Sequence, residues 1–433
     1  MTTMGANRLP TALRAGVLRA AVRVGSRGGR TPHRLLGSLP ADVVATLERD
    51  GLDPVTRLLS GAPVRRIRLP LGVRGWLVTG YDEVRAVLAD GATFSNDFGH
   101  LLGRTGAGRE LDPGGLGFSD PPHHTRLRRL LAPELTPRRL ALRSGRIAEI
   151  VSGQLDHLEG QARRHEAVDL VQHFAQPVPW LAICDLLGIP DADRAALLEL
   201  GRERFDLGGG VVASLGAVTD WVRFLRAMVT RMRAAPGPGL IGRLSAASGD
   251  ELDDVELAGL VDGMIVGGLE TTASMLALGA VVLVQDEQVS ASLRRGQPPR
   301  PYVDELLRHL SVVQVAFPRF ARTDTLVGET SVRAGDVVVC SLLAANRDAR
   351  RGDGLDLVEP APSSAHLAFG HGLHRCVGAE LARLELETAL PALVQRFPHL
   401  RLAVAPEDLV FRARSVVFGV QELPVLLGSP VRR

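Results

Sequence analysis

Lysine is missing from this sequence of 433 residues, so all 51 of its Lys or Arg positions are arginine. Cysteine is nearly as rare, with only Cys184, Cys340 and Cys376. Three scattered cysteines exclude a disulfide framework and fit a reducing cytoplasm. Because 45% of the residues are hydrophobic, the chain can bury a large core without disulfides or a structural metal. The absence of lysine and the abundance of Ala, Gly, Leu and Val are typical of a GC-rich bacterial genome.

Acidic residues are missing from the first 41 positions, which hold seven arginines. These arginines interrupt every apolar run, which excludes a secretory signal peptide. The rest of the chain has 44 arginines against 48 acidic residues. We expect residues 1–40 to form a flexible Arg-rich arm and residues 41–433 to form one folded domain. Contact of the arm with an anionic surface is the alternative.

Long apolar runs are also rare, and residues 263–284 are the exception. Glu270 lies well inside this run, and an acid near the middle of a membrane span costs about 2.5–3.5 kcal/mol. We therefore expect no transmembrane segment, but a long central helix buried in a soluble protein. Gly267 and Gly268 each cost roughly 1 kcal/mol relative to alanine in a helix interior. They are explained if the backbone kinks there or lets another group approach closely.

The periodicity of the apolar residues predicts one large domain, mainly α with a minor β part. A small hairpin is expected over 64–81, helices from residue 82 onward, including 180–204, 212–234 and 253–285, and further strands near 327–343. No internal repeat or long linker is visible.

The stretch "FGHGLHRCVG", residues 369–378, surrounds Cys376 with glycines. A closed zinc site is excluded because no second cysteine lies nearby. A nucleophile would need His374 within reach of the sulfur, and an inert buried thiol would not need the three glycines Gly370, Gly372 and Gly378. The amphipathic helix that follows places the sulfur at a helix N-terminus, which favours a thiolate. Such a loop suits a single axial thiolate ligand, as in some haem proteins.

This loop resembles the haem-binding loop of the cytochrome P450 family, and "GGLETT", residues 267–272, resembles its oxygen-activation motif. The resemblance covers the chain from about residue 45 to its end. It implies a single-domain cytochrome P450 fold with haem b between the central helix and the cysteine-loop helix. Cys376 would ligate the iron, and Gly267 and Gly268 would leave room for dioxygen. Thr271 would hydrogen-bond the oxygen being activated while Glu270 relays protons. Phe369, Gly370 and Gly378 would frame the cofactor.

Two further sets of residues follow from the same resemblance. Glu305 and Arg308, in "ELLR", share a helix face and would form a buried structural pair. The haem propionates would be held by four cationic side chains: His124, Arg128, Arg319 and His374. Family members usually place an arginine just before "LDL", where this chain has Gly354. We expect Arg350 or Arg351 to join the Glu305–Arg308 pair instead, with backbone groups and water as the alternative.

The resemblance implies a cytoplasmic bacterial monooxygenase of secondary metabolism. It would hydroxylate or epoxidise a small apolar molecule with dioxygen. No flavin or iron–sulfur pattern is visible, so electrons would come from a separate ferredoxin-type donor and its reductase, and no nucleic-acid partner is expected. Oxidative ring or aryl coupling of a small or carrier-bound substrate is the alternative, and a haem-free docking relative is the third hypothesis. The pocket would be lined by residues 96–117, the 200–215 region and five side chains further on: Val313, Val315, Ala316, Phe317 and Val417.

Overall fold

The computed structural model describes residues 44–69, 73–97, 116–205, 210–351, 356–357, 366–412 and 415–428, without the side chains of 202–218, 250 and 351. The expected arm, residues 1–40, lies outside this part of the chain. So do Gly354 and most of the 96–117 segment.

Helices make up most of the described chain, as the apolar periodicity predicts. Their bounds are α4 Thr56–Leu59, α5 Tyr81–Ala89, α7 His123–Leu131, α8 Pro137–Ala141, α9 Ser144–Ala162, α10 Pro177–Leu187, α11 Asp191–Phe205, α12 Gly210–Ala234, α13 Leu240–Ser248, α14 Asp254–Gln285, α15 Glu287–Arg294, α16 Arg300–Leu310, α17 Leu342–Asn346 and α18 Ala379–Arg396. Short helical turns occur at Ala132–Leu135, Val171–Ala175, Gly249–Glu251, Ala349–Arg351, Gly372–His374 and Pro406–Asp408.

The stretch 180–204, expected to be helical, contains two helices. Gly188 ends α10 with φ of 78°, a left-handed conformation that glycine adopts without strain, and Pro190 precedes α11. Together these two residues separate α10 from α11.

The minor β part is a five-stranded sheet in the order β3-β4-β10-β7-β5 with smaller sheets beside it. The predicted hairpin is confirmed, because β3 and β4 pair in antiparallel fashion. In contrast, β10 pairs with β4 in parallel. The strands are β1 Arg49–Asp50, β2 Asp53–Pro54, β3 Val64–Arg68, β4 Arg74–Val78, β5 Phe94–Ser95, β6 Val168–Asp169, β7 Arg319–Ala321, β8 Thr325–Val327, β9 Thr330–Val332, β10 Val337–Cys340, β11 Arg401–Leu402 and β12 Pro424–Leu426.

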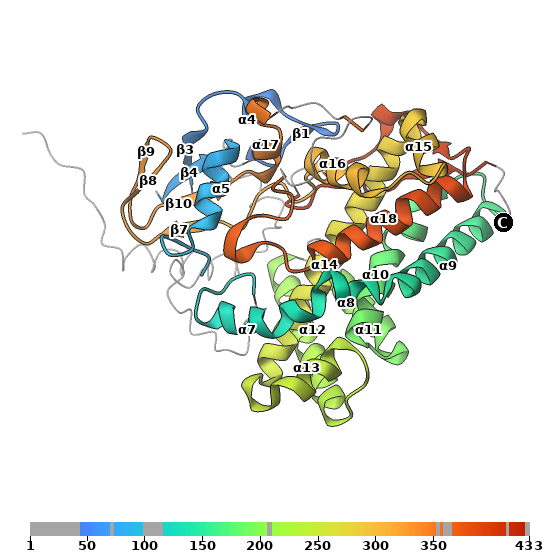
Figure 1. Ribbon diagram of the computed structural model, residues 1–433, viewed down its shortest axis with the longest axis horizontal. Helices are drawn as coiled ribbons and strands as arrows, with labels where there is room; N and C mark the ends of the chain where they lie inside the picture. The colour runs from blue at the N-terminus through green and yellow to red at the C-terminus, as the bar shows by residue number, and fades with distance from the viewer. Residues whose placement is uncertain are drawn as a thin grey trace, which may run out of the picture.

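Figure 1 shows the strands β3, β4, β7 and β10 gathered with α5 on one side, while α9, α10 and α18 lie on the other. Helix α14 is the centre of the helical part, since it packs against α10, α12 and α18. It begins with a capping box, in which Asp253 accepts a hydrogen bond from the Glu256 N–H and Glu256 accepts one from the Asp253 N–H.

Helix α14 is also long and apolar enough to cross a membrane by length and composition, and no other helix of the described residues is. However, 67% of its most apolar stretch is buried inside the protein. That burial is what the core helix of a soluble domain requires, in agreement with the interpretation of Glu270 in the sequence.

Candidate active site

The cysteine loop folds tightly against α5. Gly370 and Gly372 have φ of 69° and 68°, which only glycine adopts readily. A Cβ atom on Gly372 would lie 2.3 Å from the carbonyl oxygen of Leu88, so that position has no room for a side chain. The loop is closed by a 2.8 Å hydrogen bond from the Cys376 N–H to the Phe369 carbonyl. Helix α18 then begins at Ala379, directly behind the cysteine.

Cys376 differs from the other two cysteines in its accessibility. Cys184 and Cys340 are buried, and burial raises the pKa of each to about 12. Cys376 has an exposed side chain. Burial by the surrounding protein raises the pKa of its thiol, while the Gly378 N–H and the charge of Arg375 lower it. Of the three thiols, Cys376 is therefore the one that a ligand can reach.

Helix α14 is less buried at the position of the predicted oxygen motif. From Leu257 to Leu283 every residue is buried except Gly263 and residues 266–271. A Cβ atom on Gly267 would meet nothing within 4 Å, so the interpretation of close approach to this helix fits the structure. The helix continues without a break through Gly268. The Thr271 hydroxyl donates a 2.6 Å hydrogen bond to the Gly267 carbonyl, one turn earlier.

Glu270 forms an ion pair with Arg412, which lies in the C-terminal segment. Arg412 also donates a 2.6 Å hydrogen bond to the hydroxyl of Ser274. Arg412 can lie this close to α14 because residue 419 is a glycine: a Cβ atom there would collide with the Arg412 guanidinium. Arg412 was not among the predicted site residues, since nothing in "FRARSVVFG" marks it as the partner of a glutamate 142 residues earlier.

The four predicted propionate ligands lie in one cluster. The rings of His124 and His374 are 4.3 Å apart between centroids. Burial lowers the pKa of each to about 4. The charge of Arg128 lowers the pKa of His124 further, and His124 lowers the pKa of His374. The charges of Arg128 and Arg319 act on His374 in the same direction. Arg319 is buried and donates a 2.7 Å hydrogen bond to the Phe317 carbonyl.

His124 is the most informative member of this cluster. It is completely buried, yet neither of its ring nitrogens has a hydrogen-bond partner among the described residues. Leaving a buried polar group unsatisfied costs about 1–3 kcal/mol. With pKa values near 4 the two histidines are neutral at neutral pH, so the positive charge of the cluster comes from Arg128 and Arg319. Two arginines beside a buried imidazole N–H that lacks an acceptor suit an anionic ligand that supplies it.

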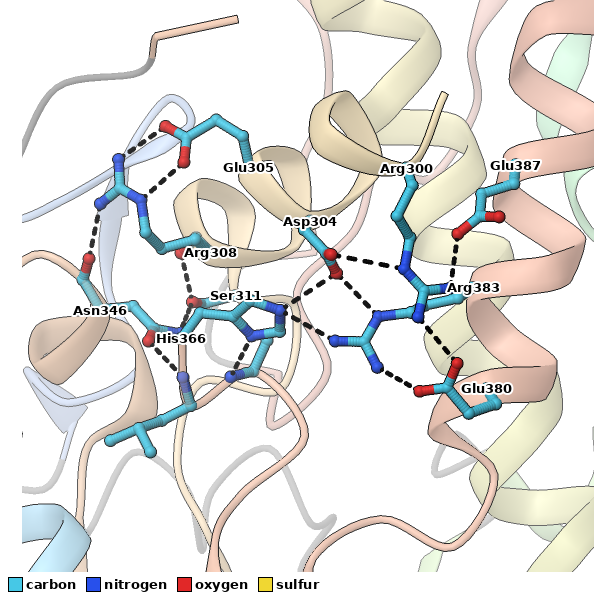
Figure 2. A network of polar contacts seen from close by, with 12 residues as sticks. Arg300, Asp304, Glu305, Arg308, Ser311, Asn346, His366, Glu380, Arg383 and Glu387 are labelled. Atoms are coloured by element: carbon cyan, nitrogen blue, oxygen red, sulfur yellow. Dashed lines mark hydrogen bonds and ion pairs between the residues drawn. The ribbon is translucent and has the colours of Figure 1, made fainter. Parts of the chain in front are cut away.

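Glu305 and Arg308 form a buried bidentate pair on α16, with N–O distances of 2.8 and 2.7 Å (Figure 2). Arg308 also donates a 2.8 Å hydrogen bond to the Asn346 carbonyl, and Glu305 accepts a 3.2 Å bond from the Asp356 N–H.

The expectation that Arg350 joins this pair is wrong. Arg350 instead donates to Asp348 and to Glu83, whose carboxylates lie closer to it. The side chain of Arg351 lies outside the described residues. The Asn346 carbonyl and the Asp356 N–H contact the pair, as the alternative of backbone groups expects.

The predicted pocket residues lie on two neighbouring segments. Val313 pairs with Val417 and Val315 with Ser341 through isolated antiparallel bridges. Phe317 is 48% exposed, and its ring lies 4.6 Å from that of Phe118. Ala316 is partly buried beside them. Most of the other expected walls, at 98–115 and in the side chains of 202–218, lie outside the described residues.

The comparisons with known proteins agree with this geometry. The family model for cytochrome P450 matches residues 356–422. Cytochrome P450 FAS1 of Rhodococcoides fascians is 37% identical over 398 residues, which cover 88% of this chain and 98% of its own. This chain belongs to the cytochrome P450 family.

Solved P450 structures are similar over nearly the whole domain. P450 StaH, from biosynthesis of the glycopeptide antibiotic A47934, is 40% identical with a TM-score of 0.80, covering 88% of this chain and 99% of its own. OxyC, implicated in an oxidative C–C coupling reaction during vancomycin biosynthesis, is 34% identical with a TM-score of 0.78 over 88% and 95%. The chain is therefore a P450 oxidoreductase, whose family uses haem with a cysteine thiolate as axial ligand, dioxygen and a redox partner.

The residues of this P450 fit haem. Cys376 offers the only accessible thiol among the three cysteines. At Gly267, α14 leaves space for a bound group, since no described atom lies within 4 Å of where a Cβ would be. The ring N–H of the neutral His124, which has no acceptor among the described residues, suits a carboxylate oxygen of a propionate.

A second polar network behind this P450's cysteine loop was missed at the sequence level (Figure 2). Asp304, on α16, accepts a 2.7 Å bond from Arg383, on α18. His366 lies 3.4 Å from Asp304, and Arg300 joins the cluster through Glu380 at 2.8 Å. Charged residues three or four positions apart on a helix are common, so the sequence gives no signal that this set is buried.

Proposed function

We propose that Cys376 is the axial ligand of the haem and that His124, Arg128, Arg319 and His374 hold its propionates. The proposal rests above all on His124, which lies beside His374 and whose buried ring nitrogens have no partner among the residues described, because an apolar site gives no reason to bury such a group. Bound haem supplies the activation of dioxygen, and a thiolate ligand favours O–O cleavage.

The chain's own residues handle protons and position the substrate. The Thr271 hydroxyl donates its proton to the Gly267 carbonyl, so the lone pairs of the hydroxyl oxygen remain available to accept a hydrogen bond. Rotation of the hydroxyl would let it donate instead. Glu270 is partly exposed and can exchange a proton with solvent once it leaves Arg412. Phe317, Val313 and Val417 offer apolar surface to a substrate.

The reaction that this site supports best is hydroxylation or epoxidation of a small apolar molecule in secondary metabolism, in the cytoplasm. Electrons come from a ferredoxin-type donor and its reductase. The catalytic domain spans residues 41–433, and residues 1–40 are an arm outside it. The Glu270–Thr271 pair supports oxygen insertion, because a carboxylate and a hydroxyl on the less buried stretch of α14 can pass protons, and protons are needed to form water from the second oxygen atom.

Oxidative coupling of aromatic groups, on a small or carrier-bound substrate, is the second candidate. It is favoured by the likeness to StaH and to OxyC, the latter implicated in an oxidative C–C coupling reaction. The exposed Phe118–Phe317 ring pair also offers a surface on which an aromatic substrate can stack.

A substrate screen and an isotope experiment decide between the two reactions. Apolar polyketides, terpenoids and aromatic peptides are screened by the spin-state change of the haem iron. Turnover of a binding compound under ¹⁸O₂, with a ferredoxin and its reductase, is then followed by mass spectrometry. Oxygen insertion adds one labelled atom to the product, whereas coupling removes two hydrogens and adds no label. Binding without either product would refute the proposed reaction.

A further inference from the structure

Arg383 is a buried arginine that neither the ligand set nor the proton pathway uses. It lies on α18, only 6% exposed, and its guanidinium contacts three different partners. Its Nε donates to Asp304 at 2.7 Å, one terminal nitrogen donates to Glu380 at 2.7 Å, and the other lies 3.3 Å from the Nε2 of His366. In Figure 2, Asp304 lies on α16, Glu380 lies on α18, and His366 lies in the segment before the cysteine loop.

The flat face of the same guanidinium covers an aromatic ring of the cysteine loop. The Cζ atom of Arg383 lies 4.7 Å from the centre of the Phe369 ring, within the range of a cation–π contact. On another side, the Phe369 ring lies 5.8 Å from that of His366. The carbonyl of Phe369 in turn accepts the 2.8 Å hydrogen bond from the Cys376 N–H.

These contacts form a continuous path from α16 to the cysteine. Asp304 fixes Arg383, Arg383 covers Phe369, and Phe369 holds the backbone of Cys376. Asp304 is itself 3% exposed, so the path lies inside the protein and is not a surface ion pair. A buried charge of this kind is costly unless its geometry is well satisfied, and here all three nitrogen positions have partners.

We propose that Arg383 is a positioning residue of the haem site: it holds Phe369 against α16 and α18 and thereby fixes the peptide that carries the Cys376 thiolate. The inference rests on the proposed role of Cys376 as the axial ligand. It depends on the planar fork of arginine, because one lysine ammonium cannot reach three separate partners and also cover a ring.

The test compares Arg383→Lys with Arg300→Lys in the holoprotein. Arg300 belongs to the same network, with bonds to Glu380 and Glu387, but it is more exposed, and no ring contact is found for it among the described residues. Two properties are measured besides turnover: the rate of haem transfer to apomyoglobin, and the fraction of reduced, CO-bound protein with the red-shifted Soret band of thiolate-bound haem. Thermal unfolding shows whether each variant is folded.

Arg383→Lys is expected to release haem about 10–100-fold faster and to lose part of the thiolate band, as for other groups that support a metal ligand. Arg300→Lys should stay close to wild type. Phe369→Leu removes the ring without touching any ion pair, so it tests the same path if Arg383→Lys folds poorly. It should reproduce the faster release, and the double variant should add little to either single one.

Three results would overturn the inference. They are Arg383→Lys or Phe369→Leu with wild-type haem release and Soret band, additive effects in the double variant, or Arg300→Lys as damaging as Arg383→Lys. A wild-type protein without the thiolate band would instead refute the proposed function, and the inference with it.

Discussion

Glu385, on α18, is predicted to destabilise the protein as the pH rises. Its side chain is 2% exposed, and its Oε2 atom has no hydrogen-bond partner in the part of the chain that the structure describes. Burial raises the pKa of this carboxyl from its ordinary 4.5 to about 8. The folded protein therefore keeps the proton at neutral pH, whereas the unfolded chain has released it.

The size of the effect follows from the pKa difference. Because the folded state binds more protons between pH 4.5 and 8, stability falls as the pH rises through that window. One pKa unit corresponds to about 1.4 kcal/mol. Between pH 5 and pH 8, Glu385 should thus reduce the free energy of unfolding by about 3–4 kcal/mol.

Glu385→Gln removes the ionisation and should remove this loss. Its amide places a new donor in an apolar site, which costs about 1–3 kcal/mol at every pH. Glu385→Gln is therefore expected to reduce the loss of unfolding free energy between pH 5 and pH 8, even if its absolute stability is lower than that of wild type. Unfolding of the holoprotein by urea at pH 5, 6.5 and 8 measures the slope, with the exposed Glu422→Gln as control. If wild type and Glu385→Gln lose the same stability between pH 5 and 8, the reasoning is wrong.

Three further predictions concern the oxygen motif, the structural pair and the arm. Thr271→Ala should bind haem and substrate normally but consume reductant while releasing peroxide in place of product; unchanged coupling of reductant to product would make Thr271 an ordinary helix residue. Glu305→Ala should leave Arg308 buried without its carboxylate, at a cost of roughly 3–5 kcal/mol, and yield haem-free or insoluble protein, so a soluble red variant of wild-type melting temperature would contradict the assignment. Deletion of residues 1–40 should leave folding and the haem spectrum intact, and loss of haem binding would place the arm inside the fold.

Much of the site was predictable because its information is local in the chain. The glycines around Cys376 and the helix that follows them lie within one short segment. The pairing of Glu305 with Arg308 needs only one helical turn. Helix α14 was visible as a long apolar run with one acid inside it.

The remaining contacts depend on tertiary packing, which local periodicity does not record. Arg383 reaches Asp304 across 79 positions of sequence. Arg350 was expected at Glu305 from its distance along the chain, but Glu83, 267 positions away, lies nearer in space. The parallel pairing of β10 with β4 likewise joins distant segments.

The reduced protein with carbon monoxide gives the most direct test of the central claim, that Cys376 is the thiolate ligand of the haem. Wild type should show the red-shifted Soret band of thiolate-bound haem, and Cys376→Ala should lose it. Because Cys184 and Cys340 are buried, neither should replace Cys376 in the variant. A Cys376→Ala protein that keeps the band would contradict the claim.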